Sequence, residues 1–115
     1  MKYMLLIYQN EAGMEAARKT DLEQVHAAYG AYTEALKKAG VLAAGDALAL
    51  STSATTVRVA NGKNQVLNGP YAETKEQLGG YYIIDVPDLD AALSWAARCP
   101  GASQGAMEVR PVRGM

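Results

Sequence analysis

A run of charged residues in the second half of the chain carries side chains suited to acid–base chemistry. Glu73, Lys75 and Glu76 follow the turn-forming pair Gly69-Pro70 and lead into an apolar segment. Carboxylates of this kind can transfer protons, and a lysine ammonium can hold an anionic substrate. The alternative is a solvated rim of surface ion pairs, which contribute little to stability. We take Glu73 and Lys75 as candidate catalytic residues and Glu76 as a candidate ligand-binding residue.

Residues elsewhere in the chain have side chains suited to the same site. His26 is the only histidine in the sequence. Because histidine can shuttle protons near neutral pH, it joins the candidate catalytic residues, with a structural role as the alternative. Arg110 shares one face of a predicted strand with Glu108. If that face meets a cleft of a dimer, Arg110 can bind a carboxylate or a phosphate in bidentate fashion, and the alternative is a structural pair with a neighbouring carboxylate across the sheet. Asp46, beside Gly45, either lines the same cleft or belongs to a turn.

The composition excludes several classes of function. A chain of 115 residues with a formal net charge of −1 predicts one domain, residues 1–115, without the basic patch that binds nucleic acid or an anionic membrane. Cys99 is the only cysteine, which excludes an intrachain disulfide and favours a reducing compartment. One cysteine and one histidine cannot build a zinc site of the Cys/His type within a single chain. We expect a cytoplasmic protein with no metal, no cofactor, and no signal or transmembrane segment.

The hydrophobic pattern predicts two helices and six strands. Segment 2–8 is apolar on both faces, which is typical of a central strand. After an irregular loop at 9–19, a capping box at 20–23 begins the first helix, and Gly40 ends it. Asp88 caps the second helix. The apolar stripe of that second helix consists of Leu89, Ala92, Leu93 and Ala96.

Turn signals separate the remaining strands. Asn61-Gly62 is a strong signal for a tight hairpin turn, and the alternation before it predicts that Val57 and Val59 face inward. Gly79-Gly80 precedes a strand and permits a ligand or a partner chain to approach closely. These strands are predicted at 41–50 with a bend at Gly45, and at 55–60, 65–67, 81–86 and 106–112.

The order of elements predicts an α+β fold of the ferredoxin-like class, a split βαβ sandwich with an inserted hairpin. Two helices cover one face of such a sheet, yet segments 2–8 and 81–86 are apolar on both faces. The second face therefore needs another cover, and a second copy of the same sheet is the simplest one. We expect a homodimer that buries on the order of 800 Å² on each partner.

Residues 68–82 resemble the signature of the DGPF group of YCII-related proteins. They read Asn-Gly-Pro-Tyr-Ala-Glu-Thr-Lys-Glu-Gln-Leu-Gly-Gly-Tyr-Tyr, and the signature is roughly Asp-Gly-Pro-Phe-x-Glu-x-Lys-Glu-x-x-x-Gly. Asn68 and Tyr71 replace the signature Asp and Phe, and the resemblance makes Tyr71 a candidate ligand-binding residue. The similarity extends over essentially the whole chain through three further segments, 1–8, 86–92 and 109–112.

The resemblance implies a dimeric α/β barrel, in which two ferredoxin-like sheets pack face to face and each protomer has a cleft. In the wider group, a histidine on the first helix, paired with an aspartate, is the proposed catalytic dyad. That position falls on Tyr29, and His26 lies one helical turn earlier, so the dyad is not carried over.

The DGPF group itself is widely described as uncharacterised, and genome neighbourhood links some members to extracytoplasmic-function sigma factors. Two functions therefore stay open. The first is a cofactor-independent small-molecule-binding protein or acid–base enzyme, such as a lyase or an isomerase. The second is a non-catalytic regulatory module that binds a sigma-factor-type partner.

Overall fold

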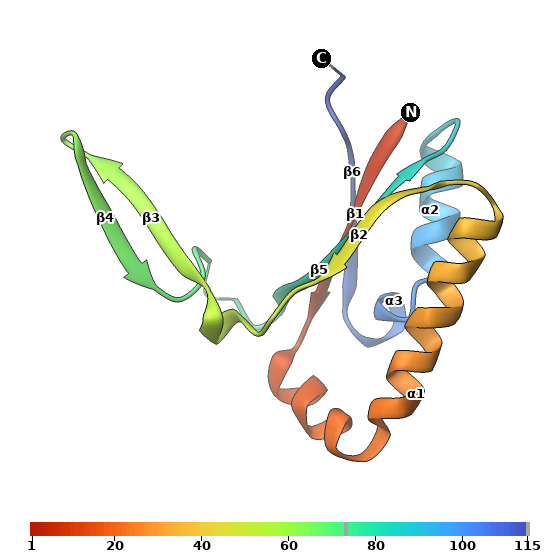
Figure 1. Cartoon of the computed structure of the whole chain (residues 1–115), viewed down its shortest axis with the longest axis horizontal. Helices are drawn as coiled ribbons and strands as arrows, with labels where there is room; N and C mark the ends of the chain where they lie inside the picture. Colours follow the sequence, from red (N-terminus) through yellow and green to blue (C-terminus); the bar gives the residue numbers. More distant parts are fainter. Residues whose placement is uncertain (73, 115) are drawn as a thin grey trace.

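A four-stranded antiparallel sheet with the strand order β2-β5-β1-β6 forms the centre of the fold. The computed structural model describes residues 1–72 and 74–114, without the side chains of residues 13–22. The sheet consists of β1 (Lys2–Gln9), β2 (Leu42–Ala47), β5 (Gln77–Asp85) and β6 (Ala106–Pro111). The helices α1 (Glu11–Lys38), α2 (Leu89–Arg98) and the short α3 (Gly101–Gln104) lie on one face of it (Figure 1). This arrangement confirms the predicted α+β fold of the ferredoxin-like class.

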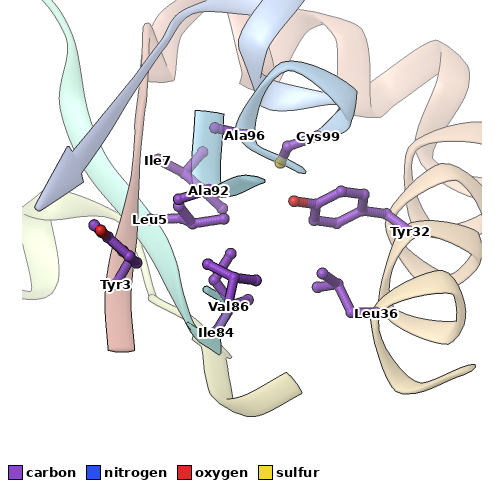
Figure 2. Packing of buried hydrophobic residues seen from close by; sticks show 10 residues of the cluster. All are labelled: Tyr3, Leu5, Ile7, Tyr32, Leu36, Ile84, Val86, Ala92, Ala96 and Cys99. Carbon is purple, nitrogen blue, oxygen red and sulfur yellow. The ribbon is translucent and has the colours of Figure 1, made fainter. Parts of the chain in front are cut away.

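The hydrophobic core lies between the sheet and the helices. Successive side chains of β1 point to opposite faces, so its odd-numbered residues face the helices and are buried. Figure 2 shows side chains from β1, β5, α1 and α2 pointing toward one another in this layer. The buried residues are Tyr3, Leu5, Ile7, Tyr32, Leu36, Ile84, Val86, Ala92, Ala96 and Cys99.

The second helix is capped as predicted but packs through a narrower face. The Asp88 carboxylate accepts a hydrogen bond of 2.9 Å from a backbone N–H of the first turn of α2, which confirms the predicted cap. Ala92 and Ala96 are buried, whereas Leu89 and Leu93 are each 47% exposed. The prediction that these leucines belong to the buried stripe is therefore wrong. Because α2 contacts the sheet through its small alanines, the larger side chains lie on the flank of the helix.

The first helix begins earlier than predicted. It starts at Glu11, so the prediction of an irregular loop over residues 9–19 is wrong, and the capping box at 20–23 lies inside the helix. Residues 11–19 are mainly Glu, Ala, Met, Arg and Lys, which favour helix strongly. The Glu11 carboxylate also accepts hydrogen bonds from the backbone N–H and the hydroxyl of Ser51, which anchors the start of α1. Gly40, with φ of 72°, follows the end of the helix as predicted.

The strands on the β2 side of the sheet also differ from the prediction. Strand β2 ends at Ala47 and not at Leu50, and its register with β5 shifts between Leu42 and Ala44. Strand β5 begins at Gln77, so Gly79-Gly80 lies within the strand and not before it. A register shift in β1 after Ile7 makes room for the extra residue in β5.

An arm projects from this body (Figure 1). The arm is the hairpin of β3 (Thr55–Ala60) and β4 (Lys63–Asn68), which follows the short 3-10 helix η1 (Ser51–Ser53). Asn61 and Gly62 have φ of 53° and 74°, as the predicted tight turn requires. Val57 and Val59 are 59% and 69% exposed, so the prediction that they face inward is wrong. The alternation is present, but the hairpin stands apart from the core.

The face of the sheet opposite the helices is called the open face below, and it is largely apolar. The register of the sheet places Met4 beside Ile83 and Leu6 beside Tyr81 on this face, and Tyr8 follows them. All five side chains are partly exposed, and every helix of the described chain lies on the other side (Figure 1). The strands that are apolar on both faces are therefore covered by helices on one face only. The predicted homodimer remains a prediction.

Candidate functional site

A cavity of about 340 Å³ lies between α1 and the part of the sheet formed by β2 and β5. We call it the cleft. Val25, His26, Tyr29 and Thr33 of α1 line one wall, and residues of β1, β2 and β5 line the other. A mostly apolar cavity with a few polar groups is typical of a small-molecule site.

The cleft is hollow because the sheet carries almost no side chains opposite α1 at this point. Gly45, Ala47, Gly79 and Gly80 form much of the sheet wall. A Cβ atom at Gly45 would lie 2.7 Å from the ring of Tyr82, so the ring occupies space that only a glycine leaves. The sequence predicted a close approach at Gly79-Gly80 by a ligand or a partner chain. In the described chain, the side chain of Gln9 approaches Gly79 closely.

The hydroxyl groups in the cleft have a defined direction of hydrogen bonding. The Thr33 hydroxyl donates to the backbone carbonyl of Tyr29 at 2.8 Å, and its oxygen lies 2.9 Å from the Tyr82 hydroxyl. A threonine hydroxyl has a single proton, so Tyr82 is the donor in the second bond. Burial raises the pKa of Tyr82, which keeps that proton in place. The phenolic oxygen of Tyr82 therefore retains its capacity to accept a hydrogen bond.

Tyr29 occupies the position at which the resemblance places a histidine, and it does line the cleft. Burial raises the pKa of Tyr29 to about 12, and the neighbouring buried Cys99 raises it as well. Burial also raises the pKa of that thiol. Neither group exchanges a proton near neutral pH, so Tyr29 cannot replace the histidine in acid–base chemistry.

Gln9 is the most unusual polar residue of the cleft. It is only 8% exposed, the single polar residue in the buried class among the described residues, and it lines the cleft. Its amide makes no hydrogen bond with any residue in the described part of the chain. No buried side-chain nitrogen or oxygen of these residues is sealed off without a partner. The Gln9 amide must therefore face the open volume of the cleft.

His26 and Asp46 both line the cleft, but they do not form a pair. The Asp46 carboxylate accepts a hydrogen bond of 2.8 Å from the Tyr81 hydroxyl. Asp46 and Tyr81 are partners across the sheet and share the open face, so this carboxylate points away from α1. His26 is exposed on α1 and makes no hydrogen bond or ion pair with another described residue. His26 is thus the only imidazole among the described side chains that line the cleft.

Two charged residues of the signature loop, Lys75 and Glu76, do not line the cleft. Lys75 and Glu76 are exposed and line neither this cavity nor the groove at the base of the arm. Glu73 lies outside the described residues. Tyr71 is 75% exposed, lines the groove at the base of the arm, and lies under the Arg58 guanidinium at 5.0 Å from its ring centre.

Arg110 lies on the open face of the sheet. Its Nε atom is 3.3 Å from a carboxylate oxygen of Glu108, and the two side chains are 71% and 44% exposed. The alternative to ligand binding was a pair with a carboxylate across the sheet, whereas this pair joins two residues of the same strand, β6. The structure therefore separates the described candidates: His26 lines the cleft, Arg110 lies on the open face, Tyr71 lies at the base of the arm, and Lys75 and Glu76 are exposed outside the cleft.

The sequence prediction missed most of the cleft. Gln9 continues the alternation of Tyr3, Leu5 and Ile7, so a polar residue at a core-facing position was a readable signal. Thr33 lies one turn from Tyr29 on the same helical face, but nothing in the sequence connects it with Tyr82. That contact depends on how α1 lies over β5.

Among the side chains that the structure describes, no group of three His, Cys, Asp or Glu is arranged to hold a metal ion. None of the helices described here is both long enough and apolar enough to cross a lipid bilayer.

Comparison with known proteins gives one family and one relative. The family model for the YCII-related domain matches residues 1–115. The uncharacterized protein R00369 of Rhizobium meliloti (strain 1021) is 40% identical over 114 residues, which cover 97% of this chain and 92% of the relative.

Proposed function

Since the chain belongs to the YCII-related domain family, whose model covers its full length, we propose that it binds a small molecule in the cleft and needs no cofactor to do so. The relative with 40% identity is itself uncharacterized, so the proposal depends on the geometry of this chain. In the proposed function, His26 at the mouth of the cleft is the acid–base group for a reaction such as an isomerisation or an elimination.

The observation that carries the proposal is the composition of the cleft wall. Glycines, Ala47 and Tyr82 on the sheet and Tyr29 on α1 enclose a ring-sized, largely apolar space of about 340 Å³. The Gln9 amide, which no described residue hydrogen-bonds, faces that space. Because it is not sealed off from the cleft, a ligand can pair with it in place of water.

The binding proposal is tested by closing the cleft. Phenol and indole are titrated into the ¹⁵N-labelled protein, and we expect shifts of the amide signals of Thr33, Gly79 and Gly80. Ala47→Phe places a ring on the cleft wall and should abolish these shifts. Ala97→Phe, at an exposed position of α2 outside the cleft, is the matched control. If neither compound shifts the cleft signals of the wild type, the proposal is refuted.

The acid–base part of the proposal is tested with 5-nitrobenzisoxazole. In this reaction a base removes the ring C–H proton, the electron pair forms a nitrile as the N–O bond breaks, and a coloured nitrophenolate results. We expect the protein to accelerate the reaction above buffer, and His26→Gln to lower the rate roughly 100-fold or to background. A rate that is unchanged in His26→Gln would remove His26 from the proposal and leave ligand binding standing.

We also propose that the protein is a homodimer through the open face. Four strands of about eight residues present roughly 500 Å² of flat sheet, from strand spacing and rise per residue. With the projecting arms added, such a contact approaches the roughly 800 Å² per partner of a stable interface. Sedimentation should give a dimer at micromolar concentration, and a folded monomer would refute this part.

A second candidate function, the regulatory module, is favoured by the arm. Val57 and Val66 are direct cross-strand partners, and they are 59% and 62% exposed on the same face of a hairpin that is marginally stable without a cover. If the protein is such a regulatory module, a purified extracytoplasmic-function sigma factor from the same organism should bind the wild type. Val57→Lys should weaken that binding without changing the affinity of the cleft for phenol. Absence of binding to the wild type would reject this candidate.

A further inference from the structure

The side-chain amide of Gln9 is a hydrogen-bonding group that can discriminate between ligands of the cleft. Its Nε2 and Cδ atoms would lie 2.2 and 2.4 Å from a Cβ atom at Gly79, so the amide rests directly on the glycine backbone. Gln9 is only 8% exposed, and its amide has no hydrogen-bonding partner in the described chain. The amide is thus positioned before any ligand is present.

A glutamine amide offers one carbonyl acceptor and two N–H donors in a fixed plane. A ligand that only accepts, or only donates, leaves one side of this buried amide unpaired. A ligand with an adjacent N–H and C=O pairs with both sides at once. The acceptor oxygen of Tyr82 adds a place for a second N–H of the ligand.

The described side chains that line the cleft favour an uncharged ligand over an anion. No lysine or arginine of the described chain lines it, and the Asp46 carboxylate is bonded to Tyr81 on the other face of the sheet. A carboxylate ligand would therefore enter an apolar site without a fixed cation, which is costly. The anion-binding residues predicted from sequence, Lys75 and Arg110, lie elsewhere.

We propose that the ligand of the cleft is an uncharged, ring-sized molecule with adjacent N–H and C=O groups, such as a primary amide or a lactam, which pairs with the side-chain amide of Gln9. This inference rests on the proposed function, because it names the class of molecule that the cleft binds.

Three compounds of nearly equal shape test the inference. Benzamide has both N–H and C=O, acetophenone has only C=O, and benzoate is an anion. Each is titrated into the ¹⁵N-labelled protein, and the shifts of the cleft amides give the dissociation constant. We expect benzamide to bind about tenfold more tightly than acetophenone, as one to two hydrogen bonds would give. Benzoate should bind more weakly than both.

Substitution of Gln9 tests its role. Gln9→Leu keeps a side chain of similar size and should lower benzamide affinity about tenfold while leaving acetophenone affinity within about twofold. Gln65→Leu is the matched control, because Gln65 is exposed on the arm and outside the cleft. Circular dichroism establishes that each variant is folded, and Gln9→Asn, which shortens the side chain but keeps the amide, gives a second measurement of the same loss.

The outcomes separate the two proposals. A preference for benzamide that disappears in Gln9→Leu, and not in Gln65→Leu, supports the inference. Equal affinity for the three compounds, or a benzamide preference that survives in both Gln9 variants, overturns it and leaves the proposed function intact. If phenol, indole and the three compounds all fail to shift the cleft amides, the proposed function fails, and the inference fails with it.

Discussion

The substitutions Gly45→Ala and Gly79→Ala each add one methyl group to the same wall of the cleft. We nevertheless expect them to have different effects on the free energy of unfolding and on ligand affinity. A Cβ atom at Gly45 would lie 2.7 and 3.1 Å from two ring carbons of Tyr82. That ring cannot turn aside easily, because its hydroxyl is bonded to Thr33 and its edge packs on Tyr32 with ring centres 5.4 Å apart. Forcing a methyl group into such packing costs about 1–3 kcal/mol.

At Gly79 the neighbour is the end of a flexible side chain. The Cβ atom would meet the Nε2 and Cδ atoms of Gln9 at 2.2 and 2.4 Å, so the amide must move. An off-rotamer side chain costs about 0.5–1.5 kcal/mol. Replacing glycine stabilises by about 0.4–1 kcal/mol, because the unfolded chain loses conformational freedom. The two effects nearly cancel, but the amide no longer rests where a ligand can pair with it.

Urea denaturation and benzamide titration of the two variants measure this difference. We expect Gly45→Ala to lower the free energy of unfolding by about 1–3 kcal/mol. Gly79→Ala should change it by less than about 1 kcal/mol and reduce benzamide affinity to the level of Gln9→Leu. Equal stability losses in both variants, or wild-type benzamide affinity in Gly79→Ala, would refute the account of the cleft wall.

Three further predictions concern the scaffold. Asp88→Ala removes the cap of α2 and should cost about 1 kcal/mol, measured as a fall in Tm of about 4 °C. The folded-state pKa of Tyr29, about 12, exceeds the ordinary tyrosine value of 10.0. The folded protein therefore holds this proton more tightly between those pH values, so the urea midpoint should fall as pH rises from about 10 to about 12, and Tyr29→Phe should flatten that fall. Leu6→Lys places a charge on the open face and should convert the dimer to a monomer in sedimentation, whereas an unchanged dimer would place the interface elsewhere.

The features predictable from sequence were those that depend on local pattern. A run that is apolar on both faces identified β1 and its central place, and the cap at Asp88 and the turn at Asn61-Gly62 each follow from residues that are close in sequence. The inward direction of Val57 failed, because a period of two shows that two faces exist but not whether another element covers either of them.

The cleft could be predicted only in part, because much of its sheet wall is formed by residues with little or no side chain. Gly79-Gly80 was visible as a place of close approach, but Gly45 read only as a bend. The Thr33–Tyr82 contact joins residues 49 positions apart, and it exists only once α1 lies over β5. Lys75 and Arg110 were chosen because they are charged. Charged side chains are usually exposed to solvent, and these two residues lie outside the cleft.

Gln9 allows a final test of whether the cleft is a binding site or an imperfection of the core. A core-facing strand position normally carries an apolar residue, and functional sites are where proteins depart from such rules. Gln9→Leu buries more apolar surface and removes an unpaired amide, so we expect it to raise the free energy of unfolding by about 0.5–2 kcal/mol while it weakens benzamide binding. Urea denaturation at neutral pH measures the first effect, and Gln65→Leu on the exposed arm controls for the general effect of removing an amide. If Gln9→Leu instead destabilises the protein, the amide supports the fold itself, and its placement in the cleft no longer indicates a ligand.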